Sequence, residues 1–340
     1  QNVSDEDWNN AITNLNTQII SGDIPDILDM SDLSVQIYHN KGLLEDLYTY
    51  MEKDPEINRD DYFGNVFDAI GIDGKLPYIT NGVAVSTMLS DASALGDTAE
   101  WTLKDLEDVL ETSGTNAISN LSSEAFLKIM LQTSDSLVDW SLGECFFDSS
   151  EFIELLEFAG KIQDNIAGNN TDMSAGLASY ETINSARYRD LYKGNLNLLG
   201  LPSDSGEYHA VKPEVKIGIS SSGNHKDGAW EFVKMFLMEE HQESCYMLPI
   251  HKGAFDTVMQ AAIDGNSMWT LVYENLKAAQ EDAETVKGLI SGASYVVNDN
   301  LTLENIVLEE AAQYFAGTMS AQEAAEKIQS RATLYIKEQM

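Results

Sequence analysis

Apolar side chains recur three or four residues apart along most of the chain, and this spacing predicts amphipathic helices. The pattern is strongest near the C-terminus, where an apolar face runs from Leu303 to Phe315 and Gly317 follows as a stop signal. Ser320 and Glu323 then form a capping box, which predicts the start of a last helix that continues through Tyr335. The C-terminal part of the chain is therefore expected to be helical.

Capping residues mark two more helix starts. In Thr102-Leu103-Lys104-Asp105 the threonine hydroxyl can accept a hydrogen bond from the third backbone amide. The segment Asp148-Ser149-Ser150-Glu151 has the same pattern, and an apolar stripe from Phe152 to Ala159 follows it, with Gly160 at the far end. We expect both helices to bury one face.

Short apolar runs between the helices predict strands. The segment from Ser21 to Leu28 indicates the end of a first helix near Gly22, followed by a buried parallel strand. Together with the segment from Lys41 to Leu47, it predicts a strand, then a ligand-side loop, then a helix. Later, Val215 to Ile219 alternates like a strand, a turn-rich connection follows, and Ala229 to Leu237 has helical spacing. Strands that alternate with helices are typical of α/β proteins.

Length and composition favour two domains. The chain has 340 residues, of which 43% are hydrophobic, and this is enough for more than one core. The pattern is least regular between Ile166 and Gly206, and no repeat of fixed period is present, which disfavours a solenoid or a propeller.

Net charge excludes several classes of partner. With 56 acidic and 20 basic residues the chain carries a formal charge of -36, so its surface repels phosphate backbones and anionic lipid headgroups. Nucleic acid is therefore not an expected partner. No run of about eighteen apolar residues is long enough to span a bilayer, and the N-terminus carries no basic-then-apolar leader.

Motifs of catalysis and metal binding are absent from the sequence. The nucleophile elbow, the zinc helix and the phosphate loop do not occur, and the five histidines are dispersed, so neither an enzyme nor a metal or cofactor site is predicted. Cys145 and Cys245 are too far apart in sequence for a metal knuckle. We expect two buried free thiols, with a single disulfide as the alternative.

Several segments, spread along nearly the whole chain, occur in the order in which one protein family has them. They are Gly22 to Ile27, Lys41 to Leu47, Asp73 to Tyr78, Trp101 to Leu106, Phe147 to Phe152, Gly200 to Pro202, Gly228 to Phe232, and Tyr314 to Gly317 with the helix through Tyr335. In this order they resemble the carbohydrate-type extracellular solute-binding proteins of ATP-driven importers, the group that includes maltodextrin-binding proteins. No single segment is specific, and their order and spacing carry the resemblance.

The resemblance implies an α/β, periplasmic-binding-protein-like fold of two hinge-connected lobes with extra C-terminal helices. Residues 1–82 and 220–290 are expected to form the N-terminal lobe, and residues 83–219 and 291–340 the C-terminal lobe. Family members usually begin with a strand, a helix and a second strand before the segment that opens here. The resemblance therefore predicts that roughly one βαβ unit is missing, together with an upstream export signal and lipid-attachment cysteine.

The implied function is the substrate-binding component of an ABC transporter. Such a protein captures a sugar or oligosaccharide in a cleft between its lobes and delivers it to the permease subunits. We expect a bacterial monomer, either lipid-anchored on the extracellular face of the membrane or periplasmic. The alternatives are a cell-surface sensing or adhesion module on the same fold, and a binder of peptides or polyols.

Candidate ligand residues follow from this resemblance and from sugar chemistry, in which aromatic rings stack on pyranose faces and polar groups bond to hydroxyls. Asp29, Met30, Ser31 and Asp32 follow the first strand, where the family places a binding loop. For Asp32 the alternative is a helix N-cap, and for Met30 it is core packing.

The remaining candidates lie further along the chain. Tyr78 and Asn81 are near the expected first crossing between lobes, and Trp140 borders a loop of the second lobe. The irregular polar region supplies Tyr180, Arg187, Tyr188 and Tyr208. For Trp140 core burial is the alternative, and for the last four an uninvolved surface loop.

Overall fold

A computed structural model of the chain describes residues 14–15, 17–19, 24–31, 33–91, 102–113, 118–119, 121–133, 136–140, 142–162, 178–183, 196–202, 210–266, 278–297 and 300–339. The chain divides into two compact units. Unit 1 comprises Gln1–Gly82, Pro213–Cys245 and Pro249–Phe255, and unit 2 comprises Val83–Lys212, Tyr246–Leu248 and Asp256–Met340. The predicted lobes have the same first boundary, but residues 213–219, predicted in the C-terminal lobe, belong to unit 1, and residues 246–248 and 256–290, predicted in the N-terminal lobe, belong to unit 2.

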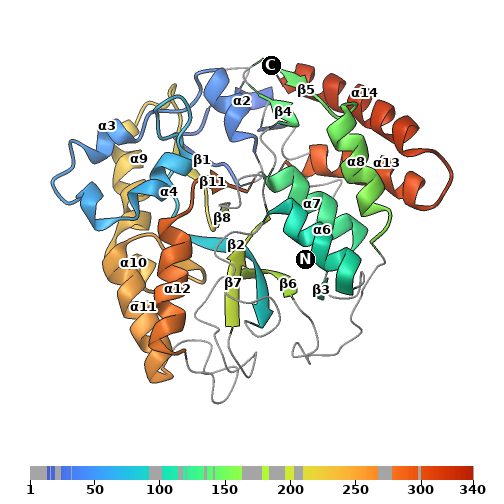
Figure 1. Cartoon of the computed structure of the whole chain (residues 1–340). Helices are drawn as coiled ribbons and strands as arrows, with labels where there is room; N and C mark the ends of the chain where they lie inside the picture. Colours follow the sequence, from blue (N-terminus) through green and yellow to red (C-terminus); the bar gives the residue numbers. More distant parts are fainter. Residues whose placement is uncertain are drawn as a thin grey trace, which may run out of the picture. The chain divides into compact units, whose positions relative to one another are not determined.

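Unit 1 is built from a two-stranded sheet and short helices (Figure 1). The strands are β1 (Ile27–Asp29) and β9 (Ile217–Ile219). The helices are α2 (Val35–Asn40), α3 (Tyr48–Met51), α4 (Gly64–Ile70), α9 (Lys226–Val233) and α10 (Glu239–Gln242), with 3-10 turns η1 (Arg59–Asp61) and η4 (Lys234–Leu237). Residues 14–15 and 17–19 are also helical, as expected for the first helix.

Two local predictions for unit 1 are corrected by the structure. The strand predicted at Pro25 to Leu28 is present as β1, but it pairs antiparallel with β9 and not parallel. Hydropathy indicates that a strand is buried and carries no information about the direction of its partner. The helix expected at Lys41 to Leu47 lies one segment earlier, at α2, and its N-cap is Ser34, whose hydroxyl accepts from the Ile37 amide at 3.5 Å.

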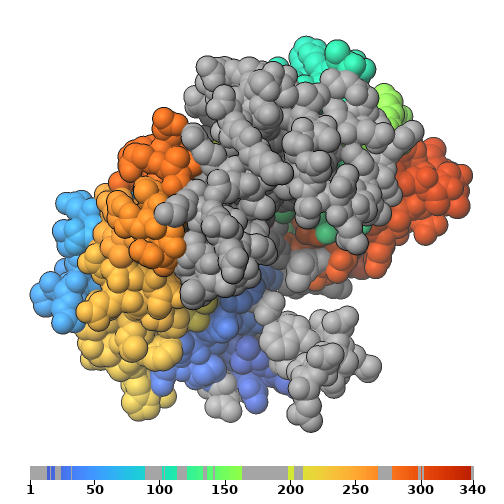
Figure 2. All heavy atoms as spheres, turned by 90° about the horizontal axis from the view of Figure 1, so that it is seen from below, coloured from blue at the N-terminus to red at the C-terminus, as the bar shows by residue number. Residues whose placement is uncertain are grey.

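Segments far apart in the sequence meet in unit 1. In Figures 1 and 2 the yellow segment near residues 220–250 lies beside the blue segment that precedes residue 80. The buried Tyr62 hydroxyl donates to the Leu237 carbonyl at 3.0 Å, and the Phe63 amide donates to the Ile250 carbonyl at 2.9 Å. The second passage of the chain through unit 1 thus completes the structure begun by the first.

Unit 2 contains a mixed sheet of seven described strands. They are β2 (Gly82–Asp91), β3 (Ile118–Ser119), β6 (Ala178–Ile183), β7 (Leu196–Gly200), β8 (Ala210–Pro213), β10 (Leu248–Pro249) and β11 (Tyr295–Val296). The order is β11-β8-β2-β6-β3, and β7 and β10 also pair with β2. A separate hairpin joins β4 (Val138–Asp139) to β5 (Glu144–Cys145).

The helices of unit 2 begin largely where their capping residues predict. They are α6 (Leu103–Ser113), α7 (Ser123–Thr133), α8 (Ser150–Ala159), α12 (Gln280–Ser291), α13 (Leu301–Phe315) and α14 (Ala321–Gln339), while α11 (Lys252–Asp264) runs from unit 1 into unit 2. The Thr102 hydroxyl accepts from the Asp105 amide at 3.1 Å, and the Ser320 hydroxyl accepts from the Glu323 amide at 3.2 Å. Both predicted caps are confirmed.

Unit 2 has a large hydrophobic core, and α8, α13 and α14 lie together around it (Figure 1). Phe147 packs edge-on against Phe152 with ring centroids 5.1 Å apart, and Val307 and Ile328 are fully buried in the same cluster. Each fully buried side chain of this size contributes about 1.5–3 kcal/mol of transfer free energy. None of the helices among the described residues combines the length and apolar character needed to cross a membrane.

Gln329 on α14 connects that helix to the hairpin. Its side-chain amide donates to the Cys145 carbonyl at 2.8 Å, and its carbonyl accepts from the Phe147 amide at 2.7 Å. We expect Gln329→Ala to lower the free energy of unfolding of unit 2 by about 2 kcal/mol or more, because two backbone groups lose their partners. Urea denaturation followed by circular dichroism measures the loss.

The matched control is Gln322→Ala on the same helix, where the exposed side chain bonds only to Glu326, one turn away. That change should cost under about 0.5 kcal/mol. Equal losses in the two variants would contradict the role given to Gln329.

Candidate functional site

The structure places two of the predicted ligand segments on opposite edges of β9. On one edge Asp29 of β1 is in register with Ile217, and the Met30 amide donates to the Lys216 carbonyl at 2.6 Å. On the other edge Ile79 exchanges both backbone hydrogen bonds with Ile217, at 2.9 and 3.0 Å. The end of β1 and the segment from Tyr78 to Asn81 therefore share one strand as their support.

Glycine at position 218 allows these segments to approach closely. A Cβ atom there would lie 3.1 Å from the Pro77 carbonyl oxygen, 3.1 Å from Leu44 Cδ2 and 3.6 Å from Met30 Cγ. The first two distances are tighter than ordinary contacts, so a larger residue would force the neighbouring segments apart. Gly218 was not among the predicted site residues. The signal that could have identified it is a glycine inside a strand pattern, which can mark a close approach of neighbouring backbone.

The residues at the end of β1 differ in exposure. Asp29 and Ser31 are exposed, and the Asp29 carboxylate accepts from the Ser31 amide at 2.9 Å, which closes a local turn. Met30 is fully buried in a hydrophobic cluster with Leu28 and Tyr38, so its surroundings fit the packing alternative. Asp29 and Ser31 are thus the polar groups of this segment that lie at the surface of the described chain.

Asn81 has an unusual environment. Its side chain is 6% exposed, its amide nitrogen donates to Cys245 Sγ at 2.8 Å, and its side-chain oxygen is buried with no hydrogen-bond partner. Leaving a buried acceptor unpaired costs about 1–3 kcal/mol. Such an atom can accept a hydrogen bond from a ligand hydroxyl or a water molecule without losing an existing partner. Tyr78, three residues earlier, is 3% exposed.

The environment of Cys245 keeps its thiol neutral. Burial raises the pKa of this thiol to about 12, and the nearby Glu214 carboxylate acts in the same direction. Glu214 also belongs to the segment that supports Asn81, because its amide donates to the Gly82 carbonyl at 2.8 Å. Both cysteines are free, as predicted, and burial also raises the pKa of Cys145. Sequence reasoning did not connect Cys245 with Asn81, and no local motif could have done so.

Two of the other predicted residues belong to unit 2. Trp140 belongs to unit 2, where it is half-buried and packs against the hydrophobic core. Tyr180 lies in β6, in register with Met88, also in unit 2. Asp32, Arg187, Tyr188 and Tyr208 lie outside the described residues.

The described part of unit 1 offers polar and aromatic groups for recognition. No cluster of three or more histidine, cysteine or acidic residues suited to a metal ion occurs among the residues that the structure describes. A neutral thiol of high pKa is a poor nucleophile, because the thiolate is the reactive form. The arrangement around Asn81 therefore fits hydrogen bonding to a ligand better than covalent chemistry.

A family model for bacterial extracellular solute-binding proteins matches residues 2–260. The chain belongs to this family. The match confirms the resemblance inferred from the sequence, and it covers most of the chain.

Solved structures share the fold of this solute-binding protein at low sequence identity. An ABC substrate-binding protein from Listeria monocytogenes, in complex with cycloalternan, is 18% identical with a TM-score of 0.62, over 99% of this chain and 90% of that chain. The sugar-binding protein MalE from Xanthomonas citri is 16% identical with a TM-score of 0.62, over 99% and 89%. A periplasmic oligogalacturonide binding protein from Yersinia enterocolitica is 15% identical with a TM-score of 0.62, over 98% and 90%. The two-lobed α/β fold implied by the sequence is thus confirmed.

The raised pKa of Cys245 in this solute-binding protein predicts slow alkylation in the folded state. A thiol with pKa near 12 stays protonated at pH 8, whereas an ordinary thiol is partly ionised there. We expect iodoacetamide to label Cys245 at least about a hundredfold more slowly in the native protein than in urea, with a rate that rises with pH from 8 to 11.

Peptide mapping by mass spectrometry separates label on Cys245 from label on Cys145. A native rate within about threefold of the rate in urea would contradict the environment described for Cys245.

Proposed function

We propose that this protein is the substrate-binding component of an ABC transporter, and that it captures a sugar or oligosaccharide and delivers it to a membrane permease. The observation that carries the proposal from the structure is the buried, unpartnered oxygen of Asn81 beside the strand that supports Asp29 and Tyr78. Sugars are dense in hydroxyl donors, which such an acceptor requires.

The comparisons support carbohydrate as the class of ligand. Similar structures of the same fold include a sugar-binding protein and an oligogalacturonide binding protein. Within this ligand class, the net charge of -36 favours a neutral sugar over a polyanionic one such as an oligogalacturonide, because like charges repel. We propose the same extracellular setting for this chain as the family has, with a lipid anchor or a periplasmic location, and a monomeric state.

The proposed ligand contacts divide by chemistry. Asp29 and Ser31 are exposed polar groups at the end of β1, and the Asn81 oxygen is a free acceptor. Trp140, which is half-buried, would provide an aromatic face for a sugar ring, and Tyr78 is proposed as a buried support of its segment, because it is 3% exposed. Asp32, Tyr180, Arg187, Tyr188 and Tyr208 complete the proposed set. Met30 is proposed as an apolar support, because it is fully buried.

The test is a thermal-shift screen against mono- and oligosaccharides, followed by calorimetry with the best ligand. A ligand that binds only the folded state raises the melting temperature by mass action. With the ligand identified, Asn81→Leu should weaken binding about tenfold or more, because the ligand loses its acceptor. The same change should leave the free energy of unfolding within about 1 kcal/mol of its value in the unaltered protein, because it also removes an unpaired buried oxygen.

Asp60→Asn in unit 1 serves as the control for changes at Asp29, since Asp60 is exposed and is not among the proposed ligand residues. Asp29→Asn should weaken sugar binding and Asp60→Asn should not. A screen in which no sugar raises the melting temperature, or in which only polyols or peptides do, would refute the carbohydrate assignment. Formation of product from an oligosaccharide would indicate an enzyme.

A further inference from the structure

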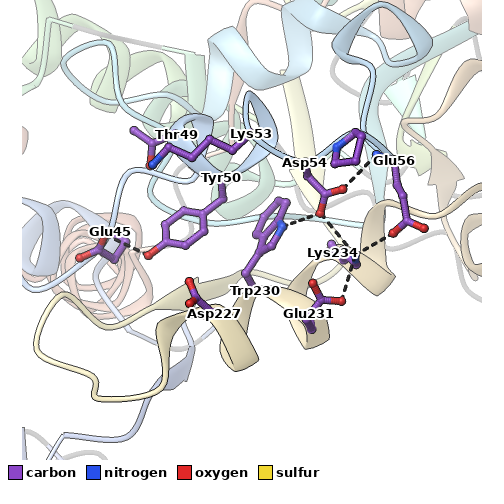
Figure 3. Close-up of a pocket in the computed structure, with 11 residues that line it drawn as sticks. Glu45, Thr49, Tyr50, Lys53, Asp54, Glu56, Asp227, Trp230, Glu231 and Lys234 are labelled. Carbon is purple, nitrogen blue, oxygen red and sulfur yellow. Dashed lines mark hydrogen bonds and ion pairs between the residues drawn. The ribbon is translucent and has the colours of Figure 1, made fainter.

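Unit 1 contains a second recognition feature that the proposed function does not use. It is an open pocket of about 580 Å³ between α3, the loop that follows α3, and α9 with η4 (Figure 3). Volumes of this size are typical of small-molecule sites. None of the residues proposed above for the sugar lines this pocket. Every residue that lines it belongs to unit 1.

Two aromatic rings lie side by side in the middle of the pocket. Tyr50 and Trp230 have ring centroids 5.5 Å apart and an interplanar angle of 33°. Trp230 is fixed, because it is 5% exposed and its indole nitrogen donates to the Asp54 carboxylate at 2.7 Å. The helical spacing of its apolar neighbours predicts a core position for Trp230, and its burial confirms this. One edge of it nevertheless lines the pocket with Tyr50.

Negative charge is in excess at one end of the ring pair. There Lys234 is 13% exposed, and its ammonium group lies 3.3 Å from Asp54, 2.7 Å from Glu56 and 2.9 Å from Glu231 (Figure 3). Three carboxylates surround one ammonium group, so two negative charges are not neutralised. Since the Glu56 and Glu231 side chains are 64% and 66% exposed, further cations can reach them.

Carboxylates also lie at the other end. The Glu45 carboxylate accepts from the Tyr50 hydroxyl at 3.2 Å and pairs with Lys226 at 2.7 Å, and the exposed Asp227 lies beside it (Figure 3). Burial raises the pKa of the Tyr50 hydroxyl to about 12, and the charges of Glu45 and Asp227 act in the same direction. Lys53, exposed at the rim, is the remaining lysine of the lining. Since Lys226 neutralises Glu45, the remaining negative charge at this end is that of the exposed Asp227, and the larger excess lies at the Lys234 end.

We propose that this pocket is a binding site for a linear diamine or polyamine, separate from the sugar site. Ammonium groups match the carboxylates at the two ends, and the methylene chain between them lies against the half-buried Tyr50 ring and the exposed edge of Trp230. An anion would be repelled. A bare metal ion would leave the aromatic faces uncovered, and no metal-binding cluster occurs in the part of the chain that the structure describes.

The test is calorimetric titration of the full chain with spermidine, in about 150 mM NaCl so that diffuse surface charge is screened beyond about 8 Å. We expect one saturable site. Butylamine, with one charge, and butane-1,4-diol, with none, should bind at least about tenfold more weakly than spermidine.

Two variants and a matched control separate the pocket from general charge. Asp227→Asn combined with Glu231→Gln removes two exposed carboxylates of the pocket, and Tyr50→Leu removes a ring; each should weaken spermidine binding about tenfold. Glu240→Gln combined with Glu243→Gln changes net charge equally, at exposed positions outside the pocket lining, and should leave the affinity unchanged. Circular dichroism verifies folding of each variant.

Absence of saturable binding by the unaltered chain at millimolar spermidine would overturn the proposal. Equal weakening in the pocket pair and the control pair would also overturn it, because binding would then reflect diffuse charge alone. Sugar binding is measured separately on the same variants, so failure of the amine site leaves the sugar assignment unaffected.

Discussion

Hydrogen bonding along both edges of β9 is the constraint on which the described candidate site depends. One edge of this three-residue strand holds β1, and the other holds Ile79, with Ile217 in register with both. Because Gly218 has no side chain, the Pro77 carbonyl and Leu44 lie closer to this strand than a Cβ atom would ordinarily permit. The positions of Asp29 and Asn81 in unit 1 therefore follow from backbone pairing more than from their own contacts.

Local signals in the sequence predicted local structure well. Capping boxes at Thr102 and Ser320 specify where helices begin, because a cap depends only on residues three positions apart. The direction of β1 could not be predicted in this way, since its partner enters unit 1 after the chain has passed through unit 2. The position of α2 was also predicted wrongly. The helix expected from Lys41 onward lies at Val35–Asn40, and Lys41 and Gly42 form the turn that follows it.

The candidate site was predictable only in part for the same reason. The sequence indicated that Asp29 follows a strand and that Tyr78 lies near the first crossing between lobes. In the structure the segments of both residues pair with β9. The contact between Asn81 and Cys245 joins residues 164 positions apart, so no spacing rule could reveal it. The Tyr50 and Trp230 pair was also hidden, because a tryptophan with helical spacing of apolar neighbours indicates a core position whether or not one edge lines a pocket.

Asn81 stands one residue before Gly82, where the chain first leaves unit 1, and Glu214 and Cys245 lie at or next to two of the later boundaries between the units. The side-chain amide of Asn81 donates to Cys245 Sγ, and the carbonyl of Gly82 accepts from the Glu214 amide. A hydrogen bond to the Asn81 oxygen would therefore form beside three places in unit 1 that each lie at or next to a unit boundary.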